Sequence, residues 1–137
     1  MERDVLLDTG PLVAVLDARD QWHAQCAGAW PALIARCATT EAVVTEACYL
    51  VMRGGASANL PLEFLLRAGI PIVGLPTRGH ERASALMARF ESLPMDYADS
   101  TLVALAEALE LTTVFTLDRR GFTTYRNGRK RFAIVPA

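Results

Sequence analysis

Four acidic residues occupy positions where a solvated carboxylate is not expected: Asp8, Glu46, Asp99 and Asp118. The first and last of them end apolar, strand-like runs, and the other two stand on helix faces that are otherwise apolar. Carboxylate oxygens are the ligands that hard divalent cations such as Mg²⁺ and Mn²⁺ prefer. Four such acids brought together would form a metal site built of oxygen ligands.

Helical periodicity places Asp99 on a face that looks buried. The residues three and four positions after it are Leu102 and Val103, so the carboxylate shares its face with an apolar stripe. Alternatively, Asp96 and Asp99 form the capping-box-like start of a helix, which the helix dipole favours. The two roles are compatible, because a residue in the first turn can also point into a cleft.

Glu46 lies in the middle of a predicted helix, where no capping role is available to it. It shares a helix face with Val43 and Leu50, which are both apolar. The alternative to a ligand role is an ion pair with Arg53 or with Arg36. We favour the ligand role, because the acid lies among apolar neighbours in a helix interior.

Asp8 and Asp118 directly follow predicted strands. In an open parallel sheet, ligands gather outside the carboxyl ends of the strands, where the connecting loops converge. As an alternative, Asp8 caps the next helix and Asp118 caps the turn of sequence DRRGF. Further polar residues close to the four acids are candidates to orient ligands or waters. These supporting candidates are Thr9, Asp96, Ser100 and Thr116.

Four carboxylates in one place require a counter-charge. At about 4 Å and an effective dielectric near 20, each like-charged pair costs roughly 4 kcal/mol. A Mg²⁺ or Mn²⁺ ion removes this repulsion and can activate a water molecule for attack on phosphorus. No cysteine or histidine pair has the spacing of zinc ligands. We therefore expect a magnesium or manganese site that acts on phosphate esters.

Basic residues are concentrated at the end of the chain. Six basic residues and no acid follow Asp118, whereas residues 1–118 carry 8 basic and 15 acidic residues. A basic segment beside an acidic cluster suits a polyanion such as RNA, although a solvated tail has the same composition. Tyr125, within this segment, could stack on an exposed base or pack in the core. The RNA-binding candidates are Arg119, Arg120, Arg126, Arg129, Lys130 and Arg131.

Length and composition predict a single domain over residues 1–137, with 52% hydrophobic and 21% charged residues. No segment approaches the roughly 18 apolar residues that a membrane helix needs, and the start, MERDVLLD, reaches an acid too soon for a signal peptide. Cys26, Cys37 and Cys48 are odd in number and lack a CxxC pair. We expect a cytoplasmic protein with three free thiols and no membrane contact.

The order of apolar patterns predicts the fold class. Short apolar runs indicate strands at residues 5–7, 38–40, 70–74, 113–116 and 132–135. Longer patterns indicate helices at residues 11–16, 22–36, 41–53, 62–68, 77–92 and 96–109, with Pro31 marking a kink or break in the second. Strands that alternate with helices predict an α/β fold, in which helices cover both faces of a parallel sheet.

Three segments carry a resemblance to a known family: LLDTGPLVAVLDARDQWH, VVTEACYLVMR and MDYADSTLVALAEALELTTVFTLDRRGFTTYR. Together they span almost the whole chain, each with an acid of the set in its usual local setting. The chain resembles PIN-domain ribonucleases of the VapC toxin type. Residues 54–94 match this family only in general helical character, so they say nothing about substrate choice.

The resemblance implies a PIN-like three-layer α/β/α fold around a central, mainly parallel sheet. It implies that Asp8, Glu46, Asp99 and Asp118 are both the metal ligands and the catalytic residues. The implied activity is that of a Mg²⁺- or Mn²⁺-dependent endoribonuclease, which cleaves RNA phosphodiesters through a metal-activated water. For the toxin branch it also implies a homodimer and a small cognate antitoxin that inserts near the site.

Three other functions have some support in the sequence. A non-catalytic RNA-binding or partner-binding module could keep the same fold, although the presence of all four acids disfavours it. A receiver-like domain that accepts phosphate on an aspartate would need a lysine near its last strand, whereas Lys130 stands within a basic run. The sequence Leu7-Asp8-Thr9-Gly10 also resembles the aspartic protease signature, but the helical pattern contradicts that β-rich fold.

Overall fold

Five parallel strands form the central sheet, in the spatial order β3-β2-β1-β4-β7. The structure is a computed structural model, and it describes residues 2–136. The strands are β1 (Val5–Leu7), β2 (Cys37–Thr40), β3 (Ile72–Val73), β4 (Thr113–Phe115) and β7 (Ala133–Val135). Because β1 and β4 are direct neighbours, the residues that follow them meet at one edge of the sheet.

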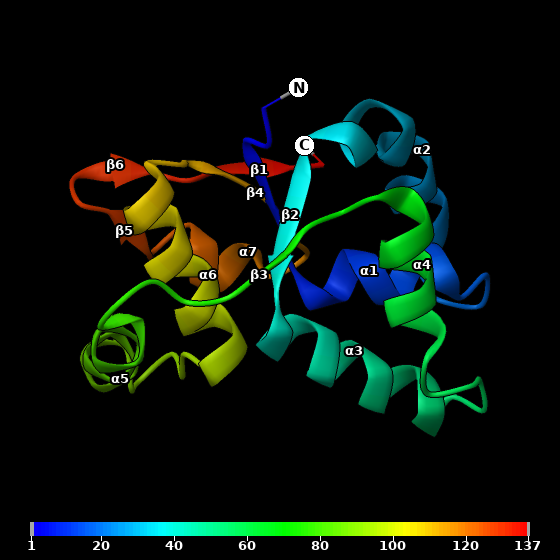
Figure 1. Ribbon diagram of the computed structural model, residues 1–137, viewed down its shortest axis with the longest axis horizontal. Helices are drawn as coiled ribbons and strands as arrows, with labels where there is room; N and C mark the ends of the chain where they lie inside the picture. The colour runs from blue at the N-terminus through cyan, green and yellow to red at the C-terminus, as the bar shows by residue number, and fades with distance from the viewer. Residues whose placement is uncertain (1, 137) are drawn as a thin grey trace.

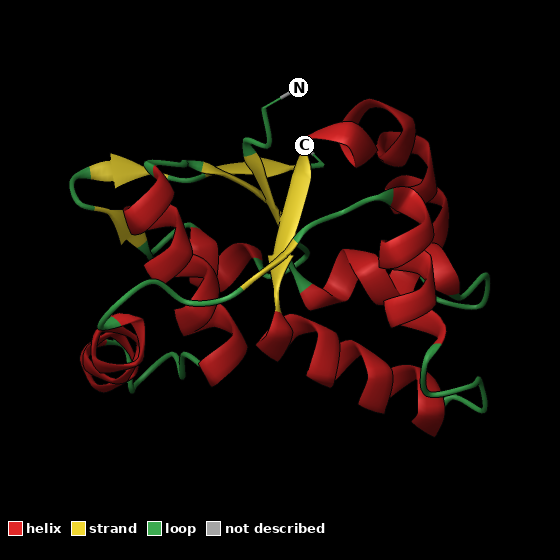
Figure 2. Ribbon diagram, viewed as in Figure 1, coloured by secondary structure: helices red, strands yellow, loops and turns green. Residues whose placement is uncertain are grey.

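Helices cover the sheet on both sides, which confirms the predicted three-layer α/β/α class (Figure 2). The longer helices are α1 (Thr9–Leu16), α2 (His23–Leu33), α3 (Glu41–Arg53), α4 (Leu60–Ala68), α5 (Gly79–Arg89) and α6 (Tyr97–Leu109). Figure 1 shows α1 to α4 on one side of the sheet, with α5 and α6 on the other. The beginnings of α1, α3 and α6 gather below the carboxyl ends of the strands in this view.

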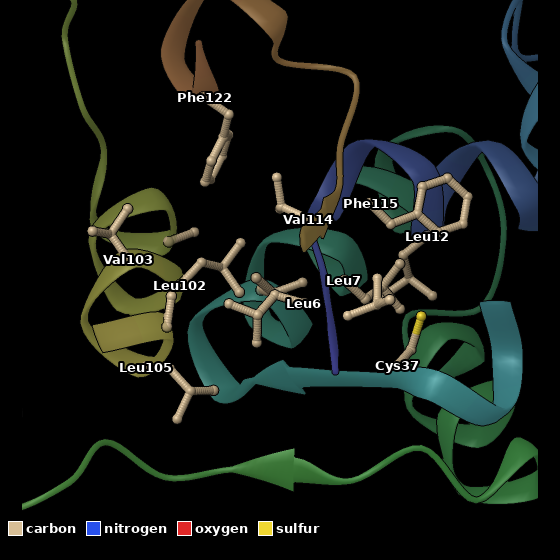
Figure 3. Packing of buried hydrophobic residues seen from close by; sticks show 14 of the residues in the cluster. Leu6, Leu7, Leu12, Cys37, Leu102, Val103, Leu105, Val114, Phe115 and Phe122 are labelled. Atoms are coloured by element: carbon tan, nitrogen blue, oxygen red, sulfur yellow. The ribbon is translucent and has the colours of Figure 1, made fainter. Parts of the chain in front are cut away.

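The strands are buried on both faces, so they consist of continuous apolar runs. All three residues of β1 are fully buried. Side chains alternate across the sheet: Leu6 faces Leu102 of α6, whereas Leu7 and Phe115 point to the opposite face, toward Leu12 of α1 (Figure 3). The core on both faces fixes the register of β1 against β4, and with it the positions of the residues that follow each strand.

Several predicted boundaries differ from the structure. The second helix does not break at Pro31 but continues to Leu33, and a 3₁₀ turn η1 (Ile34–Arg36) completes it. The third strand keeps only two residues, since β2 pairs with only Ile72 and Val73. The predicted helix at residues 77–92 is shorter, because it begins at Gly79 and ends at Arg89.

The basic segment contains structure that its pattern did not predict. A short helix, α7 (Arg119–Phe122), follows Asp118, and β5 (Arg126–Asn127) pairs with β6 (Lys130–Arg131) in an antiparallel hairpin. Elements of two to four residues are too short for hydrophobic periodicity to reveal.

Across residues 2–136, no helix is both long and apolar enough to cross a membrane.

The buried face of α6 is expected to dominate the stability of the sheet. Replacing Leu102, which is 0% exposed, by alanine should lower the free energy of unfolding by about 2–5 kcal/mol, because it leaves a cavity against β1. Leu109→Ala on the same helix is the matched control, since that side chain is 48% exposed. Urea unfolding followed by circular dichroism measures both changes. Equal losses for the two variants would contradict this packing.

Candidate metal centre

The four acids singled out in the sequence line one hollow at the carboxyl edge of the sheet. Asp8, Glu46, Asp99 and Asp118 all contribute to its wall, and its volume is about 340 Å³. Two supporting candidates, Thr9 and Asp96, also line it. The structure thus brings together acids that are up to 110 residues apart in the chain.

Asp8 is fixed by the start of α1 and by the end of β4. Its Oδ1 accepts a hydrogen bond from the Thr9 backbone N–H at 2.7 Å, so the residue caps α1 as one interpretation predicted. Its Oδ2 accepts from the Thr116 hydroxyl, also at 2.7 Å. Both contacts are buried, and Asp8 is only 7% exposed. The carboxylate therefore has one orientation, set by the start of α1 and by the residue that follows β4.

Thr116 connects Asp8 to Asp118. Its hydroxyl donates to Asp8 Oδ2 and accepts from the Asp118 backbone N–H at 2.9 Å. Asp118 Oδ1 in turn accepts from the Gly121 backbone N–H at 3.0 Å, so this acid caps α7. Thr116 was predicted to support the acids, and the structure places it in direct contact with the Asp8 side chain and the Asp118 backbone.

Gly121 was missed in the sequence, although it has a steric role at the site. A Cβ at this position would collide with Asp118 Oδ2 and would lie 3.0 Å from the Tyr125 hydroxyl oxygen. Only glycine fits between the carboxylate and the ring. The signal in the sequence was a glycine three residues after an acid in the turn DRRGF, but its meaning depends on the position of Tyr125.

Asp99 and Asp96 form a capping box at the start of α6. Asp96 Oδ1 accepts from the Asp99 backbone N–H at 2.8 Å, and Asp99 Oδ2 accepts from the Asp96 backbone N–H at 3.2 Å. Asp99 is nevertheless buried and lines the hollow, whereas Asp96 is exposed at its rim. The capping role and the position in the cleft therefore coexist at Asp99. Ser100, another supporting candidate, makes its hydrogen bond within α6, because its hydroxyl donates to the Tyr97 carbonyl.

Glu46 is partly buried on the second turn of α3 and faces the same hollow. The two arginines considered as its partners contact other groups. Arg36 forms a two-bond ion pair with Asp4, at 2.8 and 2.9 Å, and Arg53 donates to the Tyr49 hydroxyl. Among residues 2–136, Glu46 has no ion pair. Its side chain is available to a ligand in the hollow.

Crowding of like charges in a buried place shifts the titration of two of these acids. Burial is the main cause that raises the pKa of Asp8 to about 6; the hydrogen bonds from Thr116 and Thr9 oppose the rise, and the charges of Asp96 and Glu46 add to it. Burial also raises the pKa of Asp99 to about 8, together with the charges of Asp8, Asp96 and Asp118. Both carboxylates are thus destabilised in their charged form, which is the electrostatic condition that a bound cation relieves.

The fit of these residues to a metal ion depends on their chemistry and on one unpaired atom. All the acids offer oxygen, which suits Mg²⁺ or Mn²⁺. Thr9 Oγ1 is buried in the wall of the hollow and has no hydrogen-bond partner within the described part of the chain. In the same residues, no three His, Cys, Asp or Glu side chains lie close enough to hold one ion. The donor set thus fits a hard cation by its chemistry, and binding one ion would require the acids to move closer together.

The predicted RNA-binding residues separate into two groups. Arg119 and Arg120 are exposed and line a second hollow beside Asp118. Arg126 instead donates to three carbonyl oxygens of its own turn, at 2.7–2.9 Å. Arg129, Lys130 and Arg131 belong to the β5–β6 hairpin, which lies at the edge of the molecule beyond α6 in Figure 1. None of these last three lines the acidic hollow.

Base stacking by Tyr125 is contradicted by the structure. The residue is fully buried and packs edge-on against Phe90 and Phe122, with ring centroids 5.1 Å apart in both pairs. Burial and the nearby charges of Asp99 and Asp118 raise the pKa of its hydroxyl. Tyr125 is therefore a core residue behind the acidic hollow, and its ring cannot reach a base.

Comparison with known proteins identifies the family. The PIN domain family matches residues 5–127, and the chain belongs to this family. Ribonuclease VapC26 of Mycobacterium tuberculosis (strain ATCC 25618 / H37Rv) is 29% identical over 135 residues, which cover 96% of this chain and 100% of that protein. The resemblance to VapC-type PIN domains is thus confirmed.

Two solved structures share the fold. The crystal structure of VapC20 of Mycobacterium tuberculosis, a toxin that cleaves the sarcin–ricin loop, matches with a TM-score of 0.77 and 18% identity, covering 84% of this chain and 90% of that one. PAE2754 of Pyrobaculum aerophilum matches with a TM-score of 0.61 and 16% identity, covering 98% and 92%. At these identities the likeness shows the three-layer fold.

The crowded acids make the stability of the metal-free protein depend on pH. Because folding raises the pKa of Asp99 from 3.8 to about 8, the folded state holds a proton that the unfolded state has lost. The free energy of unfolding in EDTA should therefore fall as pH rises from about 4 to about 8. Asp99→Asn should remove most of this slope, whereas Glu91→Gln, at an exposed acid outside the hollow, should keep it. Urea unfolding at several pH values measures the slope, and an equal slope in both variants would refute the charge crowding.

The close approach at Gly121 predicts a steric sensitivity. Gly121→Ala should destabilise the protein by about 1–3 kcal/mol, because the new methyl group must displace Asp118 or Tyr125. Gly28→Ala is the control, since a Cβ there meets no atom within 4 Å and alanine favours a helix interior. Thermal unfolding compares the two variants. A Gly121→Ala protein as stable as the parent would disprove the tight contact.

Proposed function

We propose that this PIN domain is a Mg²⁺- or Mn²⁺-dependent endoribonuclease and the toxin of a toxin–antitoxin pair. The observation that carries the proposal is the convergence of Asp8, Glu46, Asp99 and Asp118 on one hollow at the sheet edge. A PIN domain family match over most of the chain and the similarity to Ribonuclease VapC26 support the choice of RNA as substrate.

The four acids would hold the ion, and their neighbours would keep them in place. When bound, a divalent cation supplies Lewis acidity to a phosphodiester and to water. Thr116 holds the Asp8 carboxylate through its hydroxyl, and Gly121 holds the Asp118 carboxylate through its backbone N–H. Thr9 offers an unpaired hydroxyl oxygen to the same hollow. Exposed Arg119 and Arg120 would attract the phosphates of RNA next to the acids.

Partners follow from the same proposal. A different hollow, between α3 and α6, shares Glu46 and Asp96 with the acidic hollow. The exposed rings of Tyr49 and Tyr97 line it. An antitoxin segment inserted there would cover the acids and block access to them.

We infer that the protein also forms a homodimer. Leu62 and Leu66 on α4 remain exposed, which supports a subunit contact.

We infer that the whole of residues 1–137 acts as one domain in the cytoplasm. Its buried residues form one contiguous core cluster that draws on both sides of the sheet. The free thiols of Cys26, Cys37 and Cys48 suit a reducing compartment.

Replacement of single acids tests the nuclease assignment. Asp99→Asn and Glu46→Gln should each reduce RNA cleavage in Mg²⁺ or Mn²⁺ by at least about 100-fold, because each removes a charged ligand. EDTA should abolish cleavage by the parent protein. Glu41→Gln is the matched control on α3, since Glu41 is exposed and does not line the acidic hollow.

Gel analysis of a labelled single-stranded RNA gives the rates. Full cleavage by Asp99→Asn, or cleavage that persists in EDTA, would reject a metal-dependent mechanism at these acids. RNA binding by the parent protein without any product would favour the alternative of a non-catalytic RNA-binding module.

A further inference from the structure

A second hollow, of about 320 Å³, continues from the acidic one around Asp118. Leu117 and Asp118 line both, so the two hollows share a wall. Trp22, Arg119 and Arg120 are among the other residues that line the second hollow. The hollow thus combines a flat aromatic surface with two positive charges, directly next to the candidate reaction centre.

Trp22 has no role in the core that would explain its position. Its side chain is 43% exposed, whereas Trp30, the other tryptophan, packs against Phe64 and Phe115 with ring centroids 5.3 and 6.0 Å apart. The backbone of Trp22 is held firmly, because its N–H donates to Asp20 Oδ1 at 2.8 Å and its carbonyl accepts from Cys26. A fixed backbone therefore presents an exposed indole ring to the hollow.

The two arginines differ in how they are held. Arg119 Nη2 donates to the Pro136 carbonyl at 2.7 Å, which ties α7 to the segment after β7. The Arg120 carbonyl accepts from Thr123 and Thr124, but its guanidinium has no hydrogen bond or ion pair with any of residues 2–136. Arg120 is therefore the cation of this hollow that is free to bind an anion, and guanidinium matches phosphate with two parallel hydrogen bonds.

We propose that this hollow binds one nucleotide of single-stranded RNA beside the scissile phosphate. The base stacks on the Trp22 ring, and the guanidinium of Arg120 pairs with the phosphate of the same nucleotide. Stacking on an aromatic ring tolerates every base, so the site fixes the position of the strand and not its sequence. This inference rests on the proposed ribonuclease function and deepens it, since it assigns a residue to substrate positioning.

Direct binding in EDTA tests the proposal without requiring cleavage. A short single-stranded RNA should quench tryptophan fluorescence, and Trp30→Phe should keep this quenching because Trp22 produces it. Trp22→Ala should raise the Kd for RNA about tenfold, whereas Trp22→Phe should retain most of the affinity because a ring remains. Arg120→Ala should reduce the slope of log Kd against log salt concentration by about one, because one phosphate contact is lost.

Three outcomes would overturn the proposal. The first is an unchanged Kd and unchanged quenching in Trp22→Ala. The second is a change in the sedimentation of Trp22→Ala with no change in Kd, which would make Trp22 a subunit contact. The third is a polyglutamate peptide that binds as tightly as RNA and equally needs Trp22, which would make the occupant an acidic protein segment. Because binding is measured without metal, a failure here is distinct from a failure of metal-dependent cleavage.

Discussion

The repulsion between carboxylates in one buried hollow is the constraint on which the rest of the site depends. Asp8 and Asp99 lie where burial and neighbouring negative charge both oppose ionisation. Such crowding of carboxylates lowers the stability of the folded protein, so the surrounding structure must hold the acids in place. The sheet does this by pairing β1 with β4, which places the ends of the two strands side by side. The starts of α1, α6 and α7 then supply backbone hydrogen bonds to the side chains of Asp8, Asp99 and Asp118.

Two small residues, Thr116 and Gly121, help to hold these acids in place. Thr116 contacts both Asp8 and the backbone of Asp118, so the two strand ends cannot move independently. Gly121 allows the Asp118 carboxylate to approach the chain closely, with Tyr125 behind it. Asp8, Asp99 and Asp118 therefore stand at strand ends and first helical turns, and Glu46 faces them from the second turn of α3. Beside these acids, Trp22 and Arg120 line the neighbouring hollow in which we propose that one nucleotide of RNA binds.

Much of this arrangement is predictable from the sequence, because strong local patterns control it. The apolar runs before Asp8 and Asp118 predicted the strand ends, and the periodicity around Asp99 predicted its buried face. The sequence could not predict Gly121 or the place of Tyr125, because both depend on α7, a helix of four residues. Nor could the sequence predict that Trp22 is exposed, since exposure of an aromatic ring depends on the packing of distant elements.

The central claim is that these separate acids together bind a divalent cation. The most direct test is X-ray diffraction from crystals grown with Mn²⁺, using the anomalous signal of manganese to locate the ion. The account predicts a manganese peak in the hollow, coordinated by carboxylate oxygens of the set Asp8, Glu46, Asp99 and Asp118. A peak elsewhere on the surface, or well-ordered acids with no manganese between them, would contradict it.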